Sequence, residues 1–128
     1  MNMESTFERT IKKFMLVNRK APHGTIYALE ALDVALVVGA FEQIVSVVFA
    51  DDGVYQLVKG QDTVSVGLKD FARAYKALED YDIRKLYVEQ DSLRARGLTA
   101  GDLLVQAEAV EAQRLGDLMD EQDVILSF

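Results

Sequence analysis

One stretch of sequence governs the expected fold: Val45-Ser-Val-Val-Phe-Ala-Asp-Asp-Gly-Val-Tyr-Gln-Leu57. Its first part is apolar and rich in β-branched residues, and it stops at the turn signal Asp51-Asp52-Gly53. This pattern predicts a strand at 44–50. A run with so few polar residues suits a parallel sheet that is covered on both faces. Because parallel neighbours need crossover helices, strands and helices should alternate along the chain.

The flanking sequence shows that alternation. Strands are predicted at 13–18, 84–89, 103–107 and 123–128, and helices at 25–38, 68–78, 92–96 and 111–119. Gly39 and Gly97 fit the left-handed position that ends a helix, and Asp91 or Ser92 fits the N-cap of the short helix. The expected fold class is α/β, with a mostly parallel five-stranded sheet, helices on both faces and a flavodoxin-like arrangement.

Length and composition indicate one domain. The chain has 128 residues and a mass of 14.3 kDa, which suits a single hydrophobic core. Residues 1–11 are expected to form a flexible N-terminal arm, and 12–128 the folded domain. No stretch is long and apolar enough to cross a membrane, and Glu4 and Glu8 are unlike a cationic signal peptide, so we expect a cytoplasmic protein.

Charge and cysteine content restrict the function. Fourteen Lys and Arg oppose 21 Asp and Glu, and the net charge of −7 argues against direct nucleic-acid binding. Arg19-Lys20, or Arg94 with Arg96, could still meet an anion or an acidic partner; the alternative is ordinary solvated loop charges. The chain contains no Cys, so it offers no thiolate nucleophile, no persulfide and no iron–sulfur ligand.

The first helix is apolar on nearly all sides. Between Ile26 and Val38 only Glu30 and Asp33 share a polar side. One sheet face can bury about half of such a helix, so a subunit interface should cover the rest, including Tyr27, Val34 and Val38. The alternative is a core helix covered by a loop of its own chain.

The strand ends offer few chemical groups. His23-Gly24 leads into a helix N-terminus that could hold an anion, but it lacks the glycine-rich and P-loop patterns. Asp51-Asp52 could suit Mg²⁺ or phosphate transfer, or simply an ordinary turn. No serine lies in a nucleophile elbow. We therefore predict no catalytic residue, no metal site and no cofactor.

Several blocks in one order resemble the DsrF/TusC branch of the DsrE family, across 12–128. They are Ala21-Pro22-His23-Gly24-Thr25, Glu30-Ala31-Leu32-Asp33, Asp52-Gly53-Val54-Tyr55-Gln56-Leu57 with Gly60-Gln61, Tyr81-Asp82, and Ser92-Leu93-Arg94-x-Arg96-Gly97-Leu98. Three blocks look closer to the DsrF side: Asn18-Arg19-Lys20-Ala21-Pro22, Ile26-Tyr27-Ala28-Leu29 and Val58-x-Gly60-Gln61-Asp62-Thr63.

The resemblance implies a sulfur relay. In this family, DsrE-like, DsrF-like and DsrH-like subunits form a heterohexamer, two copies of each, that passes persulfide sulfur between small carrier proteins. The active subunit carries its sulfur on a cysteine at the end of the third strand, and this chain has Val88-Glu89-Gln90-Asp91 there. The resemblance therefore implies a non-catalytic structural subunit acting in sulfur oxidation.

Two other readings stay open. One is a TusC-like subunit of the relay that serves tRNA 2-thiouridine synthesis, and the other is a stand-alone regulatory domain that binds a small anion at His23-Gly24. Tyr55 and Gln56 are expected at the rim of the partner's cysteine site or at a subunit contact; alternatively, Tyr55 closes the bottom of the core. The expected partner-facing residues are Tyr27, Val34, Val38, Asp52, Tyr55, Gln56, Arg94 and Arg96.

Overall fold

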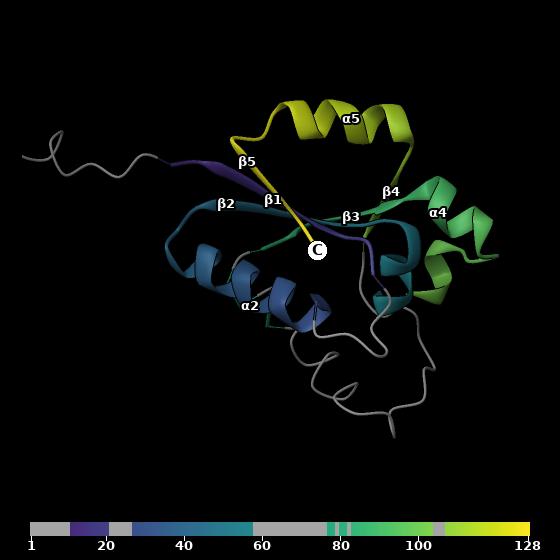
Figure 1. Ribbon diagram of the computed structural model, residues 1–128, viewed down its shortest axis with the longest axis horizontal. Coiled ribbons are helices and arrows are strands. Elements are labelled where there is room, and N and C mark those ends of the chain that lie inside the picture. The colour runs from purple at the N-terminus through teal and green to yellow at the C-terminus, as the bar shows by residue number, and fades with distance from the viewer. Residues whose placement is uncertain (1–10, 21–26, 58–76, 79, 82, 104–106) are drawn as a thin grey trace, which may run out of the picture.

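The computed structural model describes residues 11–20, 27–57, 77–78, 80–81, 83–103 and 107–128, with the backbone alone for 27–32. Within them, five strands form one sheet (Figure 1). The strands are β1 (Lys13–Asn18), β2 (Ile44–Phe49), β3 (Lys85–Glu89), β4 (Glu108–Val110) and β5 (Val124–Ser127). All four neighbouring pairs are parallel. The predicted α/β class and five-stranded sheet are confirmed.

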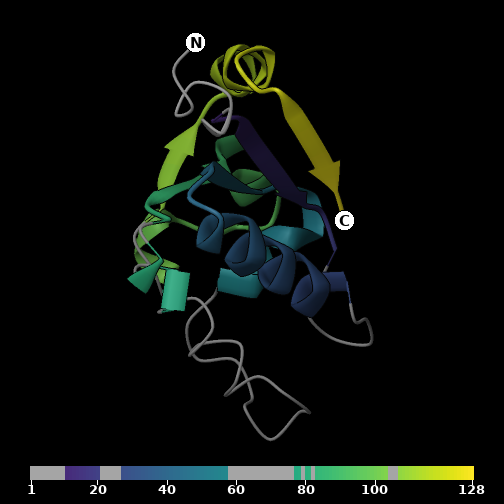
Figure 2. The same ribbon diagram turned by 90° about the vertical axis from the view of Figure 1, so that its left-hand side faces the viewer.

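Helices cover both faces of the sheet. Helix α2 (Tyr27–Ala40) lies against one face and α5 (Ala112–Asp120) against the other (Figures 1 and 2). The short helix α4 (Gln90–Ala95) and two 3₁₀ segments, η1 (Asp51–Leu57) and η2 (Ala100–Asp102), connect the strands. No helix among the described residues combines the length and the apolar composition needed to cross a membrane.

The strand order is β4-β3-β2-β1-β5. In the flavodoxin order, β1 lies between β2 and β3. Here β1 lies between β2 and β5, so the chain builds the sheet outward from β1 through β4 and then returns to the other side of β1. The order therefore differs from flavodoxin in detail, and the switch point lies between β1 and β5.

Each face of the sheet has its own core. Beneath α2, buried side chains from β1, β2 and β3 pack with Ala35 of the helix and with η1 residues such as Val54 and Leu57. Beneath α5, Leu115 and Leu118 pack on Met15, Val17, Val48 and Val110. Successive residues of one strand point to opposite faces, and in β2 Val47 and Val48 serve different cores. The apolar run in β2 is thus explained by burial on both sides.

The predicted end of the first helix is wrong by two residues. Helix α2 continues through Gly39 to Ala40, and Glu42 adopts the left-handed conformation with φ 61°. Gly39 has a different role, because a Cβ there would lie 2.8 Å from Cδ1 of Ile83. Its missing side chain lets the segment ahead of β3 press against the helix.

Two further predictions need correction. The strand predicted at 103–107 is instead β4 at Glu108–Val110, because pairing with Tyr87–Glu89 sets the register and Leu103 is buried after η2. The N-cap of α4 is Glu89 rather than Asp91 or Ser92. The left-handed Gly97 is confirmed, with φ 67°.

Other predictions lie outside the described residues. They are the arm at 1–10, the His23-Gly24 turn, the side chain of Tyr27 and nearly all of the helix predicted at 68–78.

Candidate functional site at the carboxyl ends of the strands

The carboxyl ends of β1, β2 and β3 lie side by side and lead into the chain segments richest in polar contacts. Parallel α/β sheets bind ligands and partners at this end. We use the name carboxyl edge for the surface made by Arg19, η1 and the segment Glu89–Arg96.

At the carboxyl edge, the backbone at the end of β1 is in close contact with the backbone that follows β2. A Cβ on Gly53 would lie 2.0 Å from the carbonyl oxygen of Asn18, so only glycine fits at this position. The same Asn18 carbonyl accepts a hydrogen bond from the Ala50 amide at 2.9 Å. Asp51 then takes a left-handed conformation, with φ 50°. The end of β2 is therefore folded tightly onto the end of β1.

Ser92 ties three elements together. Its hydroxyl donates to a carboxylate oxygen of Glu89, and its oxygen accepts the amide of Asp51 at 2.8 Å. Ser92 is only 3% exposed, so these bonds are shielded from water. The contact links the start of η1, the end of β3 and the first turn of α4. A buried and bonded hydroxyl of this kind supports structure and is not an accessible nucleophile.

Arg96 organises the surface above Ser92. Its guanidinium donates to Oδ1 of Asp52 through Nε and Nη2, at 3.1 and 2.9 Å, and to the carbonyl of Ser92 at 3.1 Å. It also lies 6.0 Å from the centroid of the Tyr55 ring, within the range of a cation–π contact. The Arg96 side chain is 21% exposed, whereas that of Asp52 is 60% exposed. The result is an ordered Asp–Arg–Tyr surface.

Other predicted partner-facing residues occupy different environments. Tyr55 is 36% exposed, at the surface and not within the core. Gln56 is 3% exposed and donates to the carbonyl of Lys20 at 2.8 Å, so it supports the edge from beneath. Arg94 is exposed and lies 3.7 Å from Asp91.

On α2, Val34 and Val38 are partly buried against the core under the helix. The outward apolar position is Val37, which is 57% exposed. Val34 and Val38 are thus less exposed than Val37, and their place in a subunit interface stays a prediction.

A shallow hollow opens at the switch point between β1 and β5. Its volume is about 470 Å³ where Arg19, Lys20 and Phe128 line it, and a connected part of about 380 Å³ reaches Glu89 and Met119. Arg19 and Asp51 line both parts and pair with each other at 2.9 Å. Among the described residues no group of three or more His, Asp or Glu side chains is placed to hold a metal ion.

Known proteins resemble this chain in sequence over nearly its whole length. The model of the DsrE/DsrF-like family matches residues 12–128. The chain belongs to the DsrE/DsrF-like family. The intracellular sulfur oxidation protein DsrF of Allochromatium vinosum is 49% identical over 92% of this chain and 97% of its own length. A TusC homologue of Vibrio vulnificus is 43% identical, over 86% and 93%, and the TusC protein of Shigella flexneri is 38% identical, over 92% and 100%.

Solved structures share the family fold. The ychN protein from E. coli superposes with a TM-score of 0.77 at 17% identity, covering 93% of this chain and all of that one. MTH1491 from Methanobacterium thermoautotrophicum gives 0.63 at 15% identity, covering 91% and 99%. At these identities the likeness extends to the fold alone.

Sequence reasoning missed the central place of Ser92 and Glu89 in this DsrE/DsrF-like chain. The only local signal was the spacing of three residues, which lets a side chain at the N-cap meet one in the first helical turn. The bond from Asp51 to Ser92 joins residues 41 positions apart, and the Asp52–Arg96 pair joins residues 44 apart. No local pattern contains that information.

Proposed function

We propose that this chain is a non-catalytic structural subunit of a cytoplasmic sulfurtransferase complex. In it the chain assembles with DsrE-like and DsrH-like subunits, two copies of each, and supports the relay of persulfide sulfur between small carrier proteins during sulfur oxidation. Membership of the DsrE/DsrF-like family supports the relay. The higher identity to a DsrF protein, 49% against 43% for a TusC homologue, favours sulfur oxidation over tRNA thiolation.

One observation carries the non-catalytic role. At the end of β3, just before the short helix, the chain has Glu89-Gln90-Asp91, where the family resemblance places a sulfur-carrying cysteine in the active subunit. Glu89 is not poised there as a reactive group, because its carboxylate accepts the Ser92 hydroxyl. The position is used to hold the carboxyl edge together, so the chemistry has to come from a partner.

The exposed part of the carboxyl edge is the surface we assign to that partner. Asp52, Tyr55, Arg94 and Arg96 lie on η1 and around α4, next to the place of the missing thiol. Tyr and Arg are the side chains most often important at the centre of protein interfaces. Arg96 is held in place by Asp52 and by Ser92, so little side-chain entropy remains to be lost on binding.

The test uses a persulfide-loaded carrier protein and mass spectrometry. The isolated chain should gain no sulfur atom, whereas in the assembled complex the sulfur should appear on the cysteine-bearing subunit. A stable adduct of one sulfur atom on this chain would contradict the proposal. So would failure to co-purify with DsrE-like and DsrH-like subunits when the three are expressed together.

A substitution at Tyr55 tests the surface itself. Tyr55→Ala should leave the fold intact, because the side chain is 36% exposed, and should slow sulfur transfer through the complex. Tyr55→Phe is the matched control, since it keeps the ring beside Arg96. If Tyr55→Ala assembles normally and transfers sulfur at the wild-type rate, this surface does not contact the partner in the way proposed.

A further inference from the structure

The opposite end of the sheet carries most of the exposed apolar surface of the described residues. Among all the described residues, seven large apolar side chains are exposed, and four of them lie close to the amino ends of β2 and β3. Val37 and Phe41 come from the end of α2 and the turn after it, and are 57% and 62% exposed. Ile44 begins β2 and is 36% exposed, and Tyr81, ahead of β3, is 47% exposed. We use the name amino edge for these four residues together with Lys85.

A hollow of about 510 Å³ lies within the amino edge. Ile44 and Tyr81 line it, and Gly39, Val45 and Ile83 contribute its apolar walls. The close packing of Gly39 against Ile83 brings α2 down onto the strands and shapes this hollow. Its volume is within the range of about 300–1,000 Å³ that is usual for binding pockets. The hollow can therefore accept side chains of another molecule.

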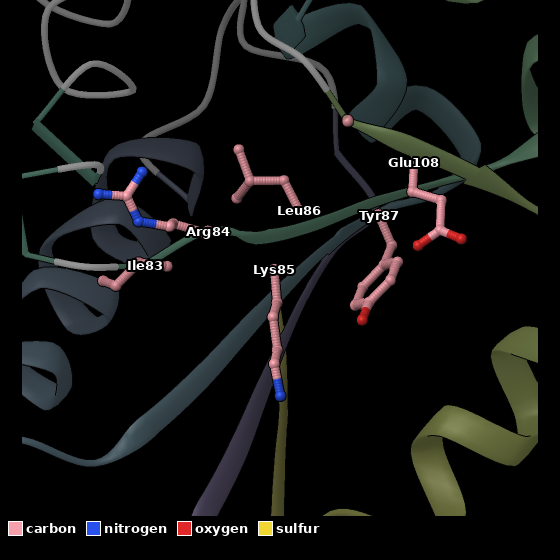
Figure 3. Close-up of a pocket in the computed structure, with 7 residues that line it drawn as sticks. Ile83, Arg84, Lys85, Leu86, Tyr87 and Glu108 are labelled. Carbon is pink, nitrogen blue, oxygen red and sulfur yellow. The ribbon is translucent and has the colours of Figure 1, made fainter.

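Lys85 and its neighbour Arg84 are the cations at the amino edge. Both line this hollow and a second one of about 560 Å³ on the other side of β3. In Figure 3, Lys85, Tyr87 and Glu108 extend to the same side of the sheet, and Leu86 extends to the other. In the part of the chain that the structure describes, Lys85 forms no ion pair. Lys85 thus lies between two hollows without an ion-pair partner among the described residues, on a chain whose net charge is −7.

We propose that the amino edge docks a protein segment that carries a carboxylate next to an apolar side chain. The carboxylate pairs with Lys85, and the apolar side chain enters the hollow beside Ile44 and Tyr81. This inference rests on the proposed function and identifies the segment as part of a different subunit from the one at the carboxyl edge. The two edges lie at opposite ends of the strands, about 20 Å apart for six residues, so two partners can bind together. A heterohexamer of three kinds of chain requires more than one contact surface on its subunits.

The composition of the amino edge favours a protein segment over the other occupants. Glu42 lines the first hollow and Glu108 the second, so these two carboxylates offset the charges of Arg84 and Lys85. No excess of positive charge is left for the many phosphates of RNA, whereas a single carboxylate needs only Lys85. A second copy would bring another net charge of −7 and another unpaired Lys85. Exposed aromatic side chains such as Phe41 and Tyr81 are typical of the centre of a protein interface.

Binding is measured between the full chain and each purified DsrE-like and DsrH-like subunit. Lys85→Glu and Phe41→Ser should each weaken binding to one of the two subunits by tenfold or more. Arg114→Glu, which makes the same charge change on the exposed face of α5, should leave binding unchanged. If both amino-edge variants bind both subunits like the wild type, this inference is wrong and the proposed function stands. If the wild type binds neither subunit, the proposed function is wrong, and this inference with it.

Cross-linking then separates the two edges. Because the chain has no Cys, Phe41→Cys and Tyr55→Cys each offer one thiol for a benzophenone label. The two labels should cross-link to different subunits of the assembled complex. Cross-linking of both labels to one subunit overturns the inference. So does a dimer of the isolated chain, or binding to an RNA oligonucleotide, that Lys85→Glu abolishes.

Discussion

Both ends of the sheet carry basic side chains, and they differ in whether these side chains are paired with aspartates. At the carboxyl edge, Arg19, Arg94 and Arg96 each pair with an aspartate of the same chain. At the amino edge, Lys85 has no such partner among the described residues, and it lines a hollow together with the exposed apolar side chains of Ile44 and Tyr81. A surface charge that is already paired within the chain helps to hold the local structure. A charge without such a pair, next to apolar side chains, can instead form an ion pair with a binding partner. Three pairs of substitutions, one at each end, test this difference.

The largest effect should come from the glycines. Gly53→Ala puts a Cβ 2.0 Å from a backbone oxygen that cannot move alone, and we expect a loss of about 3 kcal/mol or failure to fold. Gly39→Ala meets the flexible tip of Ile83 at 2.8 Å and should cost about 1 kcal/mol. Chemical denaturation measures both. Gly116→Ala, where nothing lies within 4 Å, is the control and should stabilise α5 by about 0.5–1 kcal/mol. Equal losses of stability in Gly53→Ala and Gly39→Ala would contradict the expectation that the backbone is packed more tightly at the carboxyl edge.

A middle-sized effect should come from two hydrogen bonds of equal length. The amide of Asp51 donates to Ser92, and the amide of Lys12 donates to Oε1 of Gln43, both at 2.8 Å. Ser92→Ala leaves a shielded donor without a partner and should cost about 1–3 kcal/mol in free energy of unfolding. Gln43→Ala exposes its donor to water, so we expect a change within about 0.5 kcal/mol. Thermal unfolding by circular dichroism distinguishes the two, and a larger loss for Gln43→Ala would refute the comparison.

The smallest effect should come from the cations. Arg96→Ala loses three hydrogen bonds and its packing on Tyr55, and should destabilise the fold by about 1 kcal/mol. Lys85→Ala removes a charge without a partner and should stay within about 0.5 kcal/mol. Repeating both measurements in high salt sharpens the result, because screening should shrink only the Arg96 effect. An equal loss in both variants would show that Lys85 has a structural role.

Much of the fold follows from the sequence because the central strands are buried on both faces. Burial made the middle of β1, β2 and β3 largely apolar, and polar residues or turn signals follow each of these runs, so the predicted limits were correct to within one residue. The edge strand β4 was misplaced because it contains exposed Glu108 and Ala109, and its position depends on hydrogen bonds to β3. Gly39 was misread because its role is a contact with Ile83, 44 positions away.

The carboxyl edge was only partly predictable for the same reason. The Asp51-Asp52-Gly53 turn was visible in the sequence, whereas the position of the cysteine in the active subunit was implied only by the family resemblance. The pairing of Asp52 with Arg96, and the burial of Ser92 beneath them, depend on which strands become neighbours. Strand order is set by the packing of helices on both faces, which a local pattern does not record.

The return of the chain to the outer side of β1 has a consequence for folding. Strand β5 pairs with β1, and the amide of Lys13 bonds to the carboxylate of Asp123, 110 positions along the chain. During synthesis, β1 therefore emerges with one side lacking its final neighbour until β5 has been made. Pairings over such sequence distances form slowly, and an open strand edge invites aggregation. The yield of soluble protein should thus depend on how quickly this last pairing forms, and on chaperones that shield β1 until it does.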